Sequence, residues 1–260
     1  MTERDQTKTL QAENERLIAL LEAHGIEWRL PVVPMPVRAT EAEPSKFSTV
    51  EKITVFRRLF QGRTDVYPVR WESKSTGRSG YSPACANEWR TGYCEKPRIK
   101  CSECGSRLLK PLTDTVIYEH LTSASTIGVY VLLPDNSCHF LAIDFDETDW
   151  REDVQGFIQS CAELGVPVAL EISRSGNGAH AWVFFASSVC ASDARRLGTA
   201  IISHTCARNR QLKLKSYDRL FPNQDTMPKG GFGSLIALPL QKKKWLRKIG
   251  QAIKCQICYQ

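Results

Sequence analysis

The sequence predicts an α+β protein that contains a βαββαβ unit, a small four-cysteine zinc knuckle and an N-terminal helix. Three observations lead to this fold class. From residue 138 onward, strand-like and helix-like apolar patterns follow one another in the order strand, helix, strand, strand, helix, strand. Four cysteines are clustered at residues 85–104. An apolar stripe with heptad-like spacing occupies the first 24 residues.

The overall composition is that of a soluble globular protein. Hydrophobic residues make up 42% and charged residues 24% of the 260-residue chain, which excludes collagenous and wholly disordered proteins. No apolar run approaches the roughly 20 residues of a membrane-spanning helix, and the polar N-terminus is unlike a secretory signal. We therefore expect a cytoplasmic protein without a membrane partner. The net charge of +7 suits a polyanionic partner but does not require one.

Residues 8–24 are predicted to form an amphipathic helix. Its stripe has a spacing of four, three, four and three residues and consists of Leu10, Asn14, Leu17, Leu21 and His24. The asparagine would favour a parallel two-stranded coiled coil, and hence a homodimer through this helix. Docking of the helix on its own domain is the alternative. We assign residues 1–29 to this helical segment and residues 30–45, which contain four prolines, to a linker.

Aromatic residues and arginines are interleaved in the next segment, 46–80, which contains VFRRLFQGRTDVYPVRWESKSTGRSG. This composition suits stacking on bases and pairing with phosphates. It suits equally an ordinary α/β segment whose arginines are solvated. Composition leaves both interpretations open.

The cysteines predict a zinc site. In a reducing compartment, ten cysteines favour a metal site and buried free thiols over disulfides. Cys101-x-x-Cys104 is followed by a glycine, which is typical of a tight turn that directs two thiolates at one ion. Cys85 and Cys94 would complete a tetrahedral four-thiolate site, and the basic residues around it suggest a knuckle that faces nucleic acid. Four further cysteines beside apolar stretches are expected to be buried: Cys138, Cys161, Cys190 and Cys206.

The βαββαβ unit follows from the apolar periodicity of the second half of the chain. The predicted elements are a strand at 140–146, a helix at 154–164, strands at 168–172 and 181–185, a helix at 192–208 and a strand at 235–240. Gly165 is expected to end the first helix and Ser192 to cap the second. In this arrangement the first and third strands lie side by side at the centre of the sheet.

Two acids, Asp144 and Asp146, stand in FLAIDFD, the first strand of this unit. Because strand side chains alternate, Leu141, Ile143 and Phe145 should face the core while the two aspartates share the other face, with Cα atoms about 6.5–7 Å apart. Two carboxylates this close repel each other unless a cation joins them, which favours a divalent metal site. Surface decoration is the alternative, since D-x-D is a common pattern.

A glycine-rich turn, RSGNG, precedes the third strand. Its candidates for phosphate binding are Arg174, Ser175, Gly176, Asn177 and Gly178. The glycines allow close backbone approach, and the polar side chains can hold phosphate oxygens. His180 opens the third strand, which the βαββαβ order places next to the two aspartates. An ordinary hairpin with a surface histidine is the alternative.

A third acid for this site stands in SYDRLFPNQD, where either Asp218 or Asp225 could fill the role. Asp218 lies beside Tyr217 and close to Leu220 and Phe221, which suggests the more structured position of the two. A solvated loop acid is the alternative for either residue.

From about residue 46 to residue 241 the chain resembles the archaeo-eukaryotic primase superfamily, and most closely the primase-polymerase domains of TOTE conflict systems. The resemblance rests on VFRRLFQGRTDVYPVRWE, the four-cysteine segment, HLTSASTIGVYVLLPDNSCHFLAIDFD, RSGNGAHAWVFF, SYDRLFPNQD and GFGSLIALPLQ. It implies a primase-polymerase domain at 46–241, with a zinc knuckle at 85–104 and an RRM-like, ferredoxin-like half that is the βαββαβ unit.

The resemblance also implies roles for single residues. Asp144 and Asp146 correspond to the paired metal-binding acids, Asp218 to the third acid, and His180 to the histidine that contacts the nucleotide phosphates. The superfamily often has a serine two residues before this histidine, where this chain has Gly178. A phosphate contact from Ser175 or Arg174 would replace that serine.

The implied activity is that of a DNA primase-polymerase with two catalytic Mg²⁺ or Mn²⁺ ions and one structural zinc. Its substrates would be nucleoside triphosphates and a single-stranded DNA template or primer-template, and a helicase encoded nearby would be a partner in a mobile-element or defence system. Relatives continue beyond LPLQ, so residues 242–260 are interpreted as a basic tail of a truncated or frameshifted chain. The alternatives are a catalytically inactive zinc-knuckle fragment that binds nucleic acid, and a two-metal phosphoesterase.

Overall fold

The computed structural model describes residues 12–13, 16–26, 47–146, 150–208 and 216–241. The chain divides into two compact units, Met1–Thr40 and Glu41–Gln260. In the first unit, residues 16–23 are helical, as the apolar spacing predicts. Ile18 is buried in this helix, whereas Leu17 of the predicted stripe is exposed. Leu10 and Asn14, the linker at 30–45 and the tail at 242–260 lie outside the described residues.

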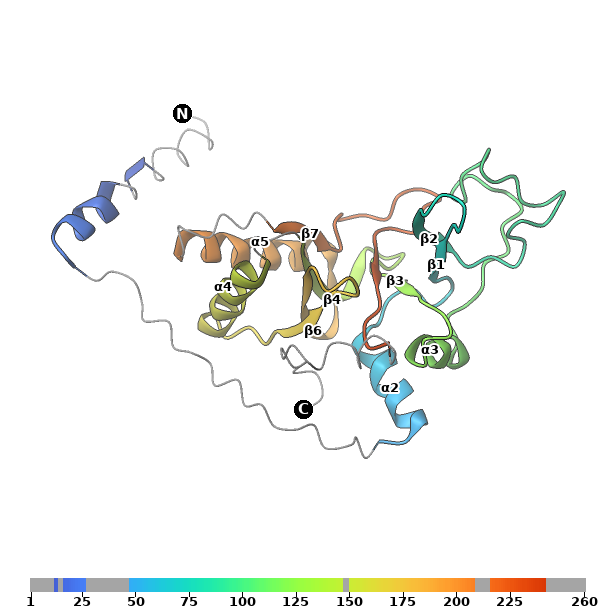
Figure 1. Cartoon of the computed structure of the whole chain (residues 1–260), viewed down its shortest axis with the longest axis horizontal. Helices are drawn as coiled ribbons and strands as arrows, with labels where there is room; N and C mark the ends of the chain where they lie inside the picture. The colour runs from blue at the N-terminus through green and yellow to red at the C-terminus, as the bar shows by residue number, and fades with distance from the viewer. Residues whose placement is uncertain (1–11, 14–15, 27–46, 147–149, 209–215, 242–260) are drawn as a thin grey trace. The chain divides into compact units, whose positions relative to one another are not determined.

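A four-stranded antiparallel sheet organises the larger unit (Figure 1). In the spatial order β5-β6-β4-β7, its strands are β5 (Ala169–Ile172), β6 (Ala179–Cys190), β4 (Ser137–Phe145) and β7 (Tyr217–Phe221). Helix α4 (Trp150–Glu163) connects β4 to β5, and helix α5 (Ala191–Arg208) connects β6 to β7. The chain order is the predicted βαββαβ order, and the first and third strands are central as expected.

The predicted position of the fourth strand is wrong. Strand β7 at 217–221 fills that place beside β4, whereas the expected strand at 235–240 becomes β8 (Leu235–Ala237) and pairs with β3 (Gly128–Tyr130) in a separate two-stranded sheet. The two backbones of this small sheet approach closely, because a Cβ on Gly128 would lie 2.5 Å from the carbonyl oxygen of Ile236. Glycine therefore permits a pairing between segments that are far apart in the sequence.

The predicted C-terminal end of α4 is confirmed, whereas the predicted N-terminal cap of α5 is wrong. Gly165 has a φ of +66° just after α4, and the next N–H, of Val166, donates to the carbonyl of Cys161 at 2.8 Å, which closes the helix. The expected cap at Ser192 is wrong, since α5 already begins at Ala191. The Ala191 N–H donates instead to the carbonyl of Asn136 at 2.9 Å.

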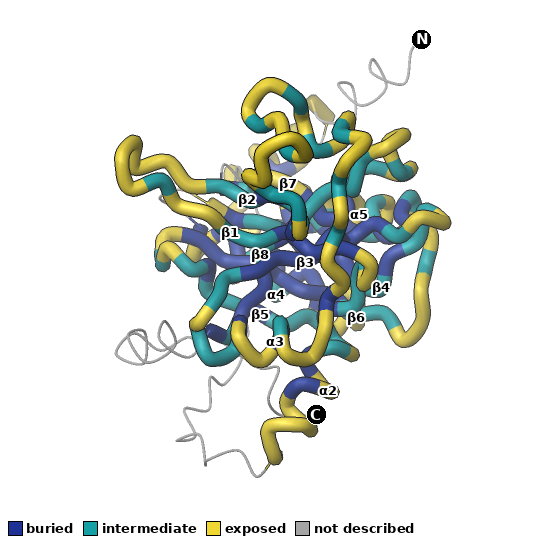
Figure 2. Tube along the Cα trace, turned by 90° about the vertical axis from the view of Figure 1, so that its right-hand side faces the viewer, coloured by how far each residue is buried: buried dark blue, intermediate teal, exposed yellow. Residues whose placement is uncertain are grey.

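The remaining elements lie on the other side of the sheet from α4 and α5 (Figure 1). They are α2 (Thr49–Leu59), α3 (Asp114–Leu121), the hairpin of β1 (Pro68–Glu72) with β2 (Ser79–Pro83), and the β3–β8 pair. A capping box begins α2: the Ser48 hydroxyl accepts from the Glu51 N–H, and the Glu51 carboxylate accepts from the Ser48 N–H. Figure 2 shows β3 as a buried segment with exposed loops around it, and in its partner β8 only the middle residue, Ile236, is fully buried.

Apolar layers cover both faces of the sheet. Leu141, Ile143 and Phe145 pack against α4 and α5, as the alternation of strand side chains predicts. Phe140 and Ala142 point to the opposite face and belong to a second core with residues of α2, α3, β3 and β8. This opposite face is the one expected to carry the aspartates, so the candidate site lies next to a core rather than on an open surface.

The four cysteines that were expected to be buried divide into two groups. Cys138 and Cys161 are buried as predicted, and burial raises the pKa of each thiol to about 12. Cys190 and Cys206 are exposed, so their predicted burial is wrong. Cys190 ends β6, whose last five residues are mostly exposed, and Cys206 is outside the set of buried positions along α5. Among the described residues, no helix has the length and apolar character needed to cross a membrane.

Candidate active site

Three carboxylates converge at the end of β4. Asp144 on β4, Asp146 just after it and Asp218 on β7 each offer an oxygen, and these three oxygens lie within 4.8 Å of one another. Asp144 is half-buried, and the other two are exposed. The antiparallel pairing of β4 with β7, which sets Asp144 opposite Arg219, brings Asp218 to this point. The structure therefore brings together the three acids that the sequence analysis singled out.

The choice between Asp218 and Asp225 follows from these contacts. Asp225 pairs with Arg195 of α5 at 2.6 Å and lies in the loop after β7, whereas Asp218 faces the other two carboxylates. Arg219 adds a positive charge that the sequence analysis did not consider, since its Nε donates to the Asp218 Oδ2 at 2.5 Å. Its guanidinium also interacts with Asp144 and Asp146 and thereby partly offsets the repulsion among the acids.

His180 lies directly opposite Asp144 in the pairing of β6 with β4. Its Nδ1–H donates to Glu171 Oε2 at 2.6 Å, and its Nε2 lies 3.4 Å from Asp144 Oδ1. Burial lowers the pKa of His180, but the charge and hydrogen bond of Glu171, together with Asp144 and Asp146, outweigh burial and raise it. The imidazolium form is thus favoured in this structure.

Burial has the opposite effect on Asp144. It raises the pKa of this carboxyl, the neighbouring Asp146 and Asp218 raise it further, and His180 and Arg219 lower it in part. The net shift is upward, so the ionised form of this cluster is held at an energetic cost. A bound cation would remove that cost.

Glu171 is a residue that the sequence analysis missed. It lies on β5 and faces His180 in the β5–β6 pairing. The signal was present in the sequence, because the hairpin around the glycine-rich turn sets residues 171 and 180 opposite each other. Its role is to bind Nδ1 and so direct Nε2 toward the carboxylates.

These features accompany a match to a known family. Residues 51–252 match the family described as the TOTE conflict system archaeo-eukaryotic primase domain. The chain belongs to this family. No curated protein matches it. A primase domain indicates nucleotidyl transfer, and such domains generally use divalent metal ions, which agrees with the acidic triad at the end of β4.

The glycine-rich turn of the primase domain packs tightly on this site. A Cβ on Gly178 would lie 2.4 Å from Asp146 Oδ1 and 2.4 Å from the carbonyl oxygen of Phe145. It would also lie 3.3 Å from the Ser173 hydroxyl, which is in hydrogen-bond contact with the Ser175 hydroxyl at 3.0 Å. Only glycine fits at position 178, because the backbone there lies against Asp146 and Phe145. The hydroxyls of Ser173 and Ser175 lie beside this position, where the superfamily often has its serine.

The other predicted phosphate-binding residues lie at the tip of the turn. Ser175 and Asn177 are exposed there, and the Asn177 N–H donates to the Ser175 hydroxyl at 3.2 Å. Gly176 has a φ of +87°, which this turn needs. Arg174 is half-buried near Tyr81 of β2: burial raises the pKa of Tyr81, and the nearby charge of Arg174 lowers it in part.

A buried hydrogen-bond network connects α4 to the backbone of Asp146 through Ser216. Asp153 of α4 is 3% exposed, and its Oδ2 accepts from the Ser216 hydroxyl at 2.6 Å and from the Ser216 N–H at 3.1 Å. The Ser216 carbonyl accepts from the Asp146 N–H at 2.7 Å. Ser216 comes directly before β7, so this network fixes Asp146 and the strand that carries Asp218 relative to each other. The available signal in the sequence was the position of Asp153, an acidic residue that shares the apolar face of α4 with Trp150 and Phe157.

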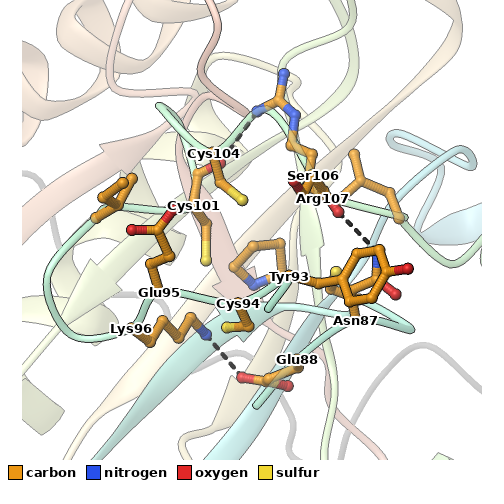
Figure 3. Close-up of a pocket in the computed structure, with 14 residues that line it drawn as sticks. Asn87, Glu88, Tyr93, Cys94, Glu95, Lys96, Cys101, Cys104, Ser106 and Arg107 are labelled. Atoms are coloured by element: carbon orange, nitrogen blue, oxygen red, sulfur yellow. Dashed lines mark hydrogen bonds and ion pairs between the residues drawn. The ribbon is translucent and has the colours of Figure 1, made fainter. Parts of the chain in front are cut away.

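The four cysteines of the predicted zinc knuckle line one pocket (Figure 3). The Leu108 N–H donates to Cys85 Sγ at 3.3 Å, a contact that stabilises a thiolate. Burial lowers the pKa of Lys96, but Glu88 and Cys101 outweigh burial and raise it, so a positive charge lies close to the sulfurs. Within the described part of the chain, one oxygen from each of the three aspartates lies within 4.8 Å of the others, whereas the four sulfurs are spread more widely around their pocket.

Proposed function

We propose that this domain is a DNA primase-polymerase, a template-dependent nucleotidyltransferase that adds nucleotides from nucleoside triphosphates on single-stranded DNA, with release of pyrophosphate, in a mobile-element or defence system. The observation that carries the proposal is the convergence of three carboxylates beside a histidine. That arrangement combines the ligands of divalent cations with a cationic group that suits a triphosphate. The family and the βαββαβ order, which is that of a ferredoxin-like, RRM-like half, support it.

The residues of the triad fit Mg²⁺ or Mn²⁺. The donors are carboxylate oxygens, which these hard cations prefer, and burial and mutual repulsion raise the pKa of Asp144 in a way that a cation would reverse. Asp144, Asp146 and Asp218 would hold the ions. When bound, two such ions activate the 3′-hydroxyl and stabilise the leaving pyrophosphate.

The chain's own groups would position the nucleotide. His180 is held by Glu171 with Nε2 directed to the triad, so it can donate to a phosphate oxygen once that oxygen displaces its contact with Asp144. The turn at 174–178 presents Ser175 and Asn177 at an exposed tip, where they can bind the outer phosphates. Orientation of the triphosphate against the attacking hydroxyl is the main catalytic contribution expected of such groups.

The zinc knuckle would serve as a structural module of the same domain. Cys85, Cys94, Cys101 and Cys104 would bind one zinc ion as thiolates, with modest movement of the sulfurs around their shared pocket. We further propose the domain limits 46–241 for the catalytic unit, a helicase as functional partner and a homodimer through the N-terminal helix.

The test is nucleotide incorporation on single-stranded DNA, with and without a primer, in Mg²⁺ and in Mn²⁺. The Asp144→Asn and Asp146→Asn double variant should lose incorporation while its circular dichroism spectrum stays unchanged. Asp225→Asn is the matched control, because this acid lies in the loop after β7 but pairs with Arg195 instead of joining the triad. Retained activity in the double variant would overturn the proposal. A folded wild type that binds zinc but incorporates nothing would favour the inactive nucleic-acid-binding fragment.

A further inference from the structure

The zinc knuckle exposes two large aromatic side chains. Trp89 is 69% exposed, more than any other aromatic residue that the structure describes, and Tyr93 is 46% exposed. Neither ring contributes to the two apolar cores. A single exposed apolar residue needs no explanation, but two exposed aromatic residues four positions apart on one loop suggest a binding surface.

The backbone at Trp89 indicates that this exposure is built into the loop. Trp89 has a φ of +60°, within the turn that the Arg90 N–H closes onto the carbonyl of Asn87 at 3.0 Å. The following turn, closed by the Tyr93 N–H onto the Arg90 carbonyl, has Gly92 at the equivalent position, with a φ of +81°. Glycine is the residue that such a position favours, whereas a bulky side chain adopts it at a cost in backbone energy. Trp89 therefore has two unfavourable contributions to its free energy, the exposure of its apolar ring and the strain of its backbone.

The charges around these rings are mainly positive. Residues 85–110 contain six basic and three acidic side chains. Glu88 forms an ion pair with Lys96, whose Nζ lies 5.7 Å from the centroid of the Trp89 ring. The exposed Arg90 guanidinium lies over the Tyr93 ring, 4.4 Å from its centroid, rather than against a carboxylate. Each ring is thus accompanied by a cation, and the exposed Arg90 is the one that can reach a phosphate.

The knuckle is anchored to the sheet that carries β3 and β8. The Arg107 guanidinium lies 5.2 Å from the centroid of the Phe232 ring and donates to the carbonyl of Gly230 at 3.0 Å. Arg63 lies 5.7 Å from the centroid of the same ring, which stacks on Tyr130 of β3. The aromatic surface of the knuckle is therefore joined to the catalytic unit by a defined packing contact.

We propose that Trp89 and Tyr93 form a stacking platform for the bases of single-stranded nucleic acid, with Arg90 binding a phosphate between them. Aromatic rings flanked by cations are the chemistry that binds single strands without sequence preference. The proposal rests on the proposed function, in which the bound strand is the template.

The experiment measures binding rather than synthesis. The full chain with Asp144→Asn is titrated into a fluorescein-labelled 20-nucleotide oligo(dT), and the dissociation constant is obtained from fluorescence anisotropy without nucleotides. Adding Trp89→Ala with Tyr93→Ala should raise Kd about tenfold or more, which is the effect of losing stacking aromatics. Trp89→Phe should restore part of the affinity, and Arg90→Ala should reduce the slope of log K against log salt by about one unit. Tyr118→Ala on α3 is the matched control, since this tyrosine is 47% exposed but lies outside the knuckle.

Each outcome separates this proposal from the function on which it rests. If the Asp144→Asn chain does not bind oligo(dT), the proposed function fails and the platform with it. If that chain binds but the double aromatic variant binds equally well, only the platform is refuted. An equal loss with Tyr118→Ala refutes it also, because the effect would then not belong to the knuckle. Unchanged zinc content and an unchanged thermal midpoint show that the variants are folded.

Discussion

His120 should make the stability of the domain depend on pH between neutral and mildly acidic conditions. Its ring is fully buried, with Nε2–H donating to the Pro239 carbonyl at 2.9 Å and Nδ1 accepting from the Ile127 N–H at 3.3 Å. Burial lowers its pKa from 6.5 to about 4. Both nitrogens are engaged in the neutral form, so a second proton would break one of these contacts. The ring thereby joins α3 to the segments that begin β3 and follow β8.

The size of the effect follows from linkage. Because the unfolded chain takes up a proton below about pH 6.5 and the folded chain only below about pH 4, stability falls as the pH drops through this window. The loss is about 2 kcal/mol at pH 5 and levels off at about 3 kcal/mol below pH 4. Above about pH 6.5 the ring is neutral in both the folded and the unfolded chain, and its contribution to the free energy of unfolding is complete.

The assay is urea unfolding of the full chain at pH 7.5 and pH 5, followed by circular dichroism. The control is His120→Gln, which keeps a donor and an acceptor but does not titrate in this range. The wild type should lose about 2 kcal/mol more than the variant between the two pH values, since all other groups titrate in both proteins. A parallel loss in the two proteins would refute the reasoning.

Three further predictions concern the supports of the site. Glu171→Gln removes the charge that holds His180 Nδ1, so KM for the nucleoside triphosphate should rise about tenfold at an unchanged thermal midpoint, measured by steady-state incorporation. Asp153→Ala leaves the Ser216 hydroxyl and amide without their acceptor, so the free energy of unfolding, measured in urea, should fall by about 3 kcal/mol. The Mg²⁺ concentration for half-maximal activity should rise in the same variant. Asp153→Asn should have a smaller effect on both quantities. Gly178→Ala places a Cβ 2.4 Å from a strand carbonyl, so stability should fall by about 1–3 kcal/mol. Wild-type stability in this last variant would contradict the close packing of the turn.

The sequence predicted the central part of the fold because local patterns decide it. The alternation in FLAIDFD and the apolar face of the helix that ends before Gly165 identify β4 and α4 without knowledge of distant contacts. The last strand was misplaced because YDRLF and the apolar run after Gly233 are both short enough to be strands. Only the pairing partners, β4 for the first and β3 for the second, distinguish them, and pairing over such sequence distances leaves no periodic signal.

The candidate site was predictable to the extent that its residues share one strand or one turn. Asp144 and Asp146 are two residues apart, and His180 follows a recognisable turn. The choice of Asp218 over Asp225 required the register of β7 on β4. Ser216 and Asp153 act through a buried hydrogen bond between a helix and the residue before a strand, and no spacing rule connects residues so placed.

The position of β7 at the edge of the sheet has a consequence for the synthesis of the protein. The triad draws two acids from the region of β4 and the third from an edge strand that leaves the ribosome much later. Until that strand emerges, the nascent chain lacks the third acid of the triad and presents β4 with one unpaired side. Open strand edges recruit other chains, so a translation product that stops within α5 would lack Asp218 and would be prone to aggregate. The strand that brings the third acid to the triad is also the one that pairs with the second side of β4.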